Sequence, residues 1–152
     1  MSAKPQAPRL FYQISRADRE LLRFLARELE AAGIAVTPPQ SMILFLLAGR
    51  DGLFMSQLAR RLEMDNAALT RMADRLVKAG LVERRALAQD RRAQSLGLTP
   101  AGQDLAKRAA AIVRQANQHL LDQLTTTEQE VLLKALDKLR QAARQPSPGE
   151  EP

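Results

Sequence analysis

The stretch from residue 56 to residue 102 constrains the fold more than any other part of the sequence. Apolar residues recur with helical spacing in two short segments, 56–62 and 67–79, which a tight turn at 63–65 separates. Gly80 follows directly and is a typical helix stop. Two short amphipathic helices joined by so short a turn predict a helix-turn-helix.

A basic β-hairpin is predicted immediately after this pair of helices. It would consist of a strand at 81–85, a polar tip at 88–92 and a returning strand at 94–98. A helix of the size of the second one fits the major groove of DNA, and a basic hairpin beside it can reach phosphates or the neighbouring minor groove. The combination predicts a winged helix whose partner is double-stranded DNA.

The charge distribution supports the same partner. The 152-residue chain has a formal net charge of +6, and residues 50–95 carry ten basic and six acidic side chains, a net charge of +4. Residues 1–49 contribute +2, and residues 96–152 are balanced. The positive excess therefore lies in the predicted winged helix, where it would supply the salt-dependent part of DNA affinity.

The composition argues against catalysis, metals and cofactors. The chain has no cysteine and a single histidine, His119, which excludes thiol chemistry and disfavours a histidine-based metal site. The sequence has no paired carboxylates, glycine-rich phosphate loop or nucleophile elbow, so we interpret the chain as a non-enzyme without a cofactor. The longest apolar run, 42–48, is too short to span a bilayer and no signal sequence opens the chain, so we expect a cytoplasmic protein without a membrane partner.

The whole chain predicts a mainly α fold (α+β) with one ordered domain. We expect a flexible arm at 1–9, a single domain at 10–144 and a disordered tail at 145–152. Within the domain, a winged helix with a two-stranded wing would span 37–99. Long helices would flank it at 11–32 and 100–144.

Capping residues predict where several of the helices start. The predicted starts are, in chain order, Thr37 with Pro38, Ser56, Asp65 or Asn66, Thr99 with Pro100, and Thr127 in a capping box with Glu130. Leu53-Phe54 is predicted to form a very short strand under the wing.

The flanking helices cannot all bury their apolar faces against so small a winged helix. A second copy of the chain is the simplest cover for them. A twofold dimer would also place two recognition helices about one turn of DNA apart. The flanking helices are therefore predicted to form a homodimer.

Four local motifs carry a resemblance to a known family. They are Thr37-Pro38-Pro39-Gln40, the run 71–76, the run 78–84, and Asp90-Arg91-Arg92 followed by Leu98-Thr99-Pro100-Ala101-Gly102. With the order of elements, they make residues 10–145 similar to the MarR (multiple antibiotic resistance regulator) family of bacterial transcription factors. The last motif is the most specific, because a D-x-R wing tip followed by L-T-x-x-G at a helix start is unusual outside that family.

The resemblance implies which residues contact DNA. The predicted set comprises residues of the two helices and the wing: Ser56, Gln57, Ala67, Ala68, Thr70, Arg71, Arg75, Arg84, Asp90, Arg91 and Arg92. Arg92 would enter the minor groove and Asp90 would brace the wing tip, whereas the strand arginines could instead face only water. The family often has Ser or Thr where this chain has Ala67-Ala68, so base reading should depend on methyl contacts, Thr70, Arg71 and DNA shape. Asp74 is interpreted as an intramolecular salt-bridge partner.

A small-molecule site is also implied. Arg16 and Arg19 suggest an anion site where the family often binds phenolic or aromatic carboxylates, and Met42 and Phe45 could line its pocket. The alternative is a solvated helix face beside an ordinary core. The sequence thus predicts a ligand-responsive homodimeric repressor that binds a pseudo-palindromic operator. The alternative function is a winged-helix module that binds DNA or a protein without a small-molecule effector.

Overall fold

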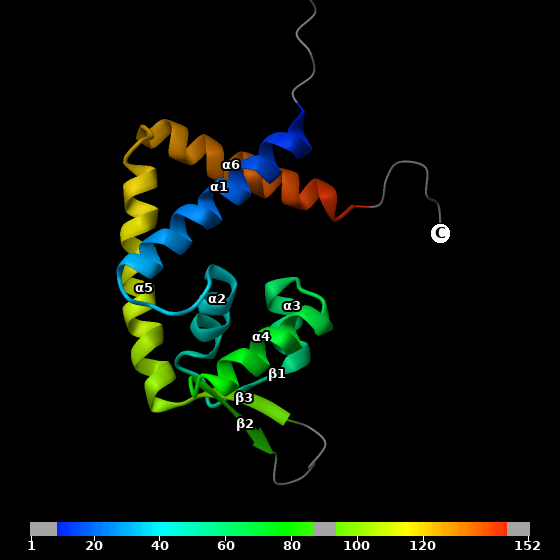
Figure 1. The fold of residues 1–152 in the computed structure, drawn as a ribbon. Coiled ribbons are helices and arrows are strands. Elements are labelled where there is room, and N and C mark those ends of the chain that lie inside the picture. The colour runs from blue at the N-terminus through cyan, green and yellow to red at the C-terminus, as the bar shows by residue number, and fades with distance from the viewer. Residues whose placement is uncertain (1–8, 87–93, 146–152) are drawn as a thin grey trace, which may run out of the picture. The chain divides into compact units, whose positions relative to one another are not determined.

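The computed structural model describes residues 9–86 and 94–145 of the chain. The elements follow one another as α1 (Leu10–Ala31), α2 (Pro38–Leu47), β1 (Leu53–Phe54), α3 (Met55–Leu62), α4 (Asn66–Lys78), β2 (Val82–Ala86), β3 (Gln94–Leu98), α5 (Pro100–Leu121) and α6 (Thr126–Ala143) (Figure 1). This mostly helical chain with a small antiparallel sheet is the predicted winged-helix fold. It divides into two compact units, residues 1–113 and 114–152, with the boundary inside α5.

The starts of α2 and α4 follow their capping residues. Thr37 accepts the backbone N–H of Gln40 and donates its own N–H to the Gln40 side chain, which completes a capping box ahead of Pro38. Asp65 accepts the N–H of Ala68 over 2.8 Å at the start of α4. The predicted caps of both helices are therefore confirmed.

Two other predicted caps are wrong. Ser56 does not cap α3, because Phe54 occupies the N-cap position with extended backbone and donates its N–H to Gln57 Oε1 over 3.0 Å. The capping box of α6 is formed by Thr125 and Glu128 rather than by Thr127 and Glu130. The earlier register lets the helix begin at Thr126, two residues before the start at Glu128 that a Thr127 cap would give.

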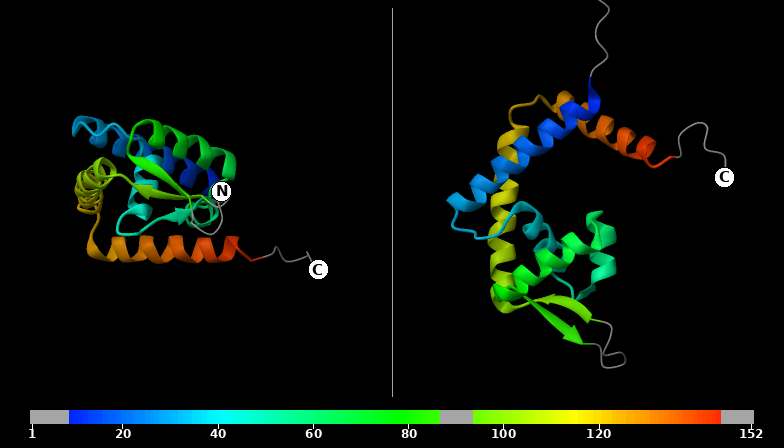
Figure 2. Two further views of the ribbon diagram at one scale, coloured as in Figure 1. Left: turned by 90° about the horizontal axis from the view of Figure 1, so that it is seen from below. Right: turned by 45° about the vertical axis from the view of Figure 1, so that its right-hand side comes forward.

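The sheet joins the wing to the start of the helix-turn-helix. Its strands lie in the order β1-β3-β2, all antiparallel, with Leu53 opposite Leu96 and Val82 opposite Leu98. The predicted short strand at Leu53-Phe54 is thus confirmed, and the sheet has three strands where the wing alone would have two. The hairpin of β2 and β3 projects from the helices of the winged helix (Figure 2).

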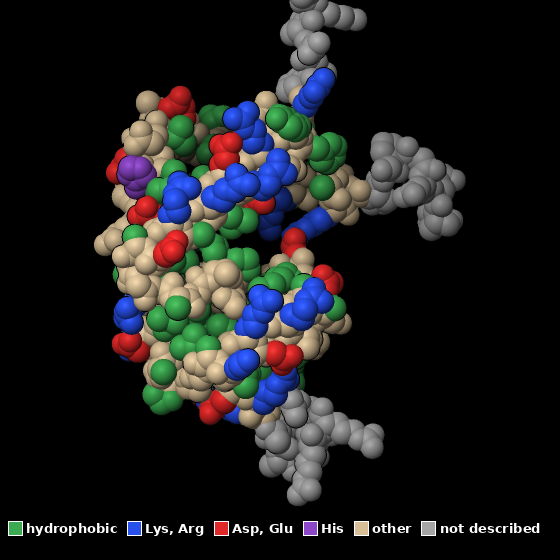
Figure 3. Space-filling view, in the orientation of Figure 1, with side chains coloured by type: hydrophobic (Ala, Val, Ile, Leu, Met, Phe, Trp, Pro, Cys, Tyr) green, Lys and Arg blue, Asp and Glu red, His purple; other side chains and the backbone are tan. Residues whose placement is uncertain are grey.

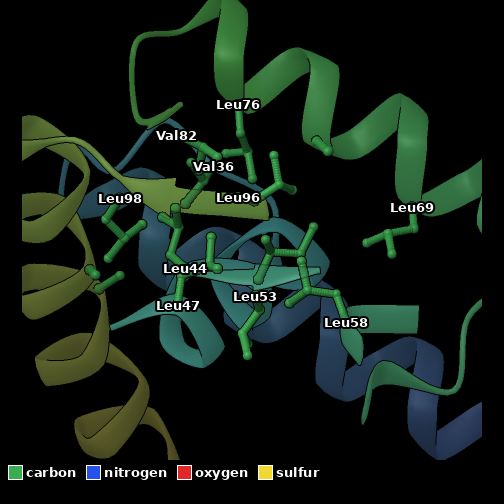
Figure 4. Close-up of a cluster of buried hydrophobic side chains, with 14 of the residues drawn as sticks. Val36, Leu44, Leu47, Leu53, Leu58, Leu69, Leu76, Val82, Leu96 and Leu98 are labelled. Atoms are coloured by element: carbon green, nitrogen blue, oxygen red, sulfur yellow. The ribbon is translucent and has the colours of Figure 1, made fainter. Parts of the chain in front are cut away.

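Leucine side chains make up most of the core of residues 1–113. Leu44 and Leu47 of α2, Leu58 of α3, and Leu69 and Leu76 of α4 are at most 1% exposed and belong to one buried cluster with Leu53, Leu96 and Leu98 of the sheet (Figure 4). Each such side chain contributes about 1.5–3 kcal/mol by leaving water. This core holds α4 with one face buried and the other on the surface.

The end of α4 is joined tightly to the start of α5. The Thr99 hydroxyl donates to the carbonyl of Gly80 over 2.6 Å and accepts the N–H of Gly102, while the Thr99 N–H donates to Leu81 O. An ideal Cβ on Gly102 would lie 1.9 Å from Leu81 O, so only glycine fits here. The L-T-x-x-G motif therefore encodes this joint.

The flanking helices bury little. In α6 no residue is buried, and in α1 only Leu29 is. The exposed large apolar side chains of these two helices are Leu10, Phe11, Tyr12, Ile14, Leu21, Leu22, Val131, Leu132, Leu133, Leu136 and Leu139. Among the described residues, no helix combines the length and apolar character that a membrane span requires.

Candidate nucleic-acid interface

The outer face of α4 carries most of the predicted recognition-helix residues. Leu69, Ala73 and Leu76 face the core, so the helical repeat turns the opposite side outward. On that side Ala67, Thr70, Arg71 and Arg75 are exposed, whereas Ala68 is half-buried. Lys and Arg side chains lie over the region of α3 and α4 in the space-filling view (Figure 3). A cationic helix face is thus available to a polyanion.

Arg71 and Thr70 differ in what they can offer to DNA. The Arg71 guanidinium forms no ion pair or hydrogen bond with any described residue, so none of its donors is used within that part of the chain. The Thr70 hydroxyl already donates to the carbonyl of Asn66 over 2.7 Å. Thr70 can therefore accept a hydrogen bond or contact a thymine methyl, while Arg71 can donate to guanine or phosphate.

The start of α3 presents Ser56 and Gln57 to the solvent. Because Gln57 Oε1 accepts the N–H of Phe54, its side-chain amide is held in place with its NH₂ group as the remaining donor. Ser56 lies beside it on the exposed side of the helix. Both side chains can act as donors to a phosphate, although Ser56 is not the helix cap.

Arg84 connects the wing to the recognition helix. Its Nη2 lies 2.5 Å from Oδ1 of Asp74, on the outer part of α4. The interpretation of Asp74 as an intramolecular salt-bridge partner is thereby confirmed. Arg84 is a predicted DNA contact, but at least one of its N–H donors already binds Asp74.

The tip of the wing lies outside the described residues. Asp90, Arg91 and Arg92, the predicted wing contacts, all fall in the segment 87–93. The strands that carry this segment are described up to Ala86 and from Gln94.

Sequence reasoning missed a second cationic surface on α3. Arg60 and Arg61 are exposed and, with Gln57, line a polar hollow of about 400 Å³. Neither guanidinium pairs with a described residue. The adjacent arginines at the end of a short helix were the available signal. They lie on the same helix as the predicted contacts Ser56 and Gln57.

The four predicted ligand residues do not come together. Met42 lines an apolar cavity of about 340 Å³ with Leu22, Leu25 and Arg61, whereas Phe45 lines a different cavity of about 500 Å³. Arg16 lies at neither cavity: its Nε is 3.0 Å from Glu20 Oε1 in an exposed ion pair. Arg19 is exposed on α1 and also lines neither.

Comparisons with known proteins agree with this geometry. The model of the MarR family matches residues 36–93. The chain is 34% identical over 106 residues to the HTH-type transcriptional repressor Rv2887 of Mycobacterium tuberculosis, covering 70% of this chain and 76% of the relative. It is 36% identical over 115 residues to the HTH-type transcriptional repressor MdtR of Bacillus subtilis, covering 71% and 70%.

A solved DNA complex has the same fold. The structure of a mutant MarR from E. coli complexed with operator DNA superposes with a TM-score of 0.78 at 29% identity, covering 86% of this chain and 92% of that one. The similarity thus extends well beyond the helix-turn-helix into the flanking helices.

Proposed function

This chain belongs to the MarR family of DNA-binding transcriptional regulators and is not an enzyme, and we propose that it acts as a homodimeric repressor that binds a pseudo-palindromic operator. The observation that carries the proposal is the outer face of α4, where Arg71 and Arg75 are exposed on a helix fixed by its leucine face. Both curated relatives described above are named repressors, which supports repression over activation.

Base reading is assigned to α4 and phosphate binding to its surroundings. Arg71 would donate to a base edge, and Thr70 would accept a hydrogen bond from a base or contact a thymine methyl. Ala67 and Ala68 would also lie close to thymine methyls. Contacts to phosphates or to the minor groove would come from Arg75, Ser56, Gln57, Arg60 and the wing residues Arg91 and Arg92. Arg84 and Asp90 would hold the wing.

A dimer is supported by the exposed leucines of the flanking helices. Residues 11–32 and 100–144 are proposed as the dimerisation region and residues 37–99 as the winged helix. Covering the apolar face of α6 with a second copy would remove that face from water. Two recognition helices about 34–36 Å apart would then reach successive major grooves.

The test of DNA binding is selection of duplexes from a random pool by the full chain. We expect an inverted repeat to be enriched and its affinity to fall steeply with salt. Arg71→Ala should cost about 1–3 kcal/mol and relax preference at one base of each half-site. Arg108→Ala, which removes an exposed arginine paired with Asp104 on α5, is the charge-matched control. Failure to enrich any sequence, with salt-insensitive binding, would refute the proposal.

A small aromatic or phenolic effector is proposed for the cavity lined by Met42. Its walls are almost wholly apolar, and Arg61 supplies a cation for a carboxylate or phenolate. A ligand there would release DNA if it favoured the unbound conformation by about 1–3 kcal/mol. Salicylate should then raise the melting temperature and weaken operator binding, and Met42→Trp, which fills the cavity, should abolish both responses.

The scattered positions of the predicted ligand residues favour a second candidate. Because Arg16, Arg19 and Phe45 do not line the Met42 cavity, the protein could bind its operator without a small-molecule effector. Under this alternative, a panel of aromatic acids changes neither the melting temperature nor operator affinity. The same titration therefore decides between the two.

A further inference from the structure

One arginine side chain crosses the whole sheet at the base of the wing. Arg85 belongs to β2, an edge strand, yet its Nη1 donates to the carbonyl of Asp51 in the loop before β1, beyond the central strand β3. On the way its Nη2 donates to the carbonyl of Leu98 in β3 over 3.4 Å. The side chain thereby connects β2, β3 and the segment that leads into β1.

A carboxylate on the same strand orients the guanidinium. Glu83 precedes Arg85 by two residues and so lies on the same face of the sheet. Its Oε1 accepts from Arg85 Nε over 2.9 Å and lies 2.8 Å from Nη2. Three of the nitrogen–oxygen contacts of Arg85 are therefore to groups in fixed strands, which aligns Nη1 with the Asp51 carbonyl.

Gly97 provides the space in which this side chain lies. Gly97 is opposite Glu83 in the register, and an ideal Cβ there would be 2.5 Å from Cζ of Arg85 and 2.7 Å from its Nε. Gly97 does not have a positive φ, so its backbone conformation is open to other residues. The glycine is explained by the guanidinium above it and not by backbone strain.

The side chains on the two faces of β2 thus contact different parts of the protein. Arg84 pairs with Asp74 of the recognition helix, and Arg85 reaches across to the loop between α2 and β1. Since β2 leads into the predicted wing tip, both contacts hold in place the strand from which that segment continues. The Arg85 contact ties the outer face of β2 to the loop that follows α2.

We propose that Arg85, whose side chain packs over Gly97, is a positioning residue that fixes the direction of the wing by binding the Asp51 carbonyl. Its role in DNA recognition rests on the proposed function. Arg85 has no contact with DNA in this proposal. Its removal leaves α4 and its base reading intact and changes only what the wing reaches. The wing contacts should therefore weaken without loss of the fold.

The first measurement uses the protein without DNA. Hydrogen exchange of the amides of β2 and β3 is compared in the wild type, Arg85→Ala, Gly97→Ala and the double variant. Losing the net stabilisation of one hydrogen bond should speed exchange about 2- to 12-fold in either single variant. The Gly97 Cβ displaces a flexible guanidinium rather than backbone, so Gly97→Ala should keep the overall melting transition.

The double variant tests whether Gly97 is needed only to make room for the Arg85 side chain or has a separate structural role. If Gly97 serves only to accommodate Arg85, then Gly97→Ala should have little further effect once Arg85 is alanine, and the two effects should not add. Additive effects would overturn the proposal. Arg85→Lys, which keeps the charge but lacks the planar fork that reaches the Asp51 and Leu98 carbonyls from two separate nitrogens, should fall between the wild type and Arg85→Ala.

The second measurement is a hydroxyl-radical footprint on the duplex that the wild type selects. Arg85→Ala and Gly97→Ala should lose protection at the outer, wing-contacted positions and keep the central protection by α4, with a salt slope smaller by about one per lost phosphate contact. Arg108→Ala should keep both protections. Unchanged outer protection in Arg85→Ala would overturn the positioning role. If the wild type itself protects no duplex, the proposed function fails, and the exchange data alone decide whether Arg85 fixes the base of the wing.

Discussion

Helices α2 and α6 are both rich in leucine, yet they have opposite environments. In α2 the side chains of Ile43, Leu44 and Leu47 are at most 1% exposed, whereas in α6 Leu132 and Leu136 are 44% and 40% exposed. The difference lies in the pattern around the leucines. α2 is apolar on almost every side and needs a surrounding core, while α6 is amphipathic and needs only one covering surface. The chain itself supplies a core for α2, and the proposed second copy would supply the cover for α6.

The largest expected effect comes from charging the exposed face of α6. In the double variant Leu132→Glu with Leu136→Glu, two carboxylates would have to be buried at the proposed interface, so the dimer should dissociate. Losing the linkage between two half-sites should lower operator affinity about 10²- to 10⁴-fold. Sedimentation velocity measures the dimer, and fluorescence anisotropy measures DNA binding.

Lys138→Glu is the matched control for that variant. It changes the net charge by the same two units at an exposed position of the same helix. It should leave the dimer and the DNA affinity nearly unchanged. A dimeric double variant with wild-type affinity would show that α6 does not form the interface, and the contrast with α2 would need another explanation.

The next largest effect compares the same truncation in the two helices. Leu44→Ala should lower the free energy of unfolding by about 2–5 kcal/mol, because the site is fully buried and leaves a cavity. Leu133→Ala removes the same atoms from a side chain that is 62% exposed at the edge of the α6 stripe, and should cost within about 0.5 kcal/mol. Urea unfolding at one protein concentration measures both. Equal losses would mean that α6 is buried to the same extent as α2.

A smaller effect is expected at the two N-caps. Asp65→Ala removes the cap of α4 and should cost about 1 kcal/mol, and Thr125→Ala should cost a similar amount at the start of α6. The consequences should differ in extent. Loss of the Asp65 cap should be visible in global unfolding, since α4 belongs to the core, whereas loss of the Thr125 cap should mainly speed amide exchange in the first turn of α6.

Asp65→Asn serves as the control for the α4 cap, because asparagine keeps the accepting oxygen. Stability close to that of the wild type is expected. If Asp65→Asn is as unstable as Asp65→Ala, the charge and not the hydrogen bond to Ala68 stabilises the helix start.

The smallest effect concerns the pKa of Glu128. The backbone N–H of Thr125 donates to the Glu128 carboxylate over 2.8 Å, and the Thr125 hydroxyl also donates to it, so both contacts lower the pKa of this carboxyl below its ordinary value. Because the folded pKa is the lower one, the contribution to stability is complete above the ordinary glutamate pKa. It is lost as the pH falls through the lowered value.

Carbon-13 NMR titration of the Glu128 carboxyl measures this shift. Thr125→Val removes the hydroxyl donor but keeps the backbone donor, so it should raise the pKa only part of the way to the ordinary value. A normal Glu128 pKa in the wild type would show that the capping box of α6 is not formed in solution.

Local signals explain which helix starts could be predicted from the sequence. Thr37-Pro38 has no competing register and is correct, and of the two caps predicted for α4, Asp65 and Asn66, the structure has Asp65. The run 125–130 contains two Thr-x-x-Glu registers, and pattern alone could not choose between them. Ser56 was a misleading signal because pairing of Leu53 and Phe54 with β3 keeps the chain extended up to Met55, where the helix begins.

The candidate site was partly predictable for a related reason. The buried leucines of α4 determine which side of that helix faces outward, so helical periodicity was enough to place Arg71 and Arg75. The contact of Arg85 with Asp51 joins residues 34 positions apart and depends on the absence of a side chain at Gly97. Nothing in the local pattern around Arg85 distinguishes it from Arg84, which faces the other way.

The joint between α4 and α5 restricts how any signal could reach the DNA-reading residues. Thr99 closes hydrogen bonds to both helix ends, and the Leu81 carbonyl occupies the position that a methyl group on Gly102 would need. The joint therefore couples the two helices closely, and we expect a tilt at the start of α5 to be transmitted to the end of α4. The orientation of the first turns of α5 would then set the angle at which the recognition helix meets DNA.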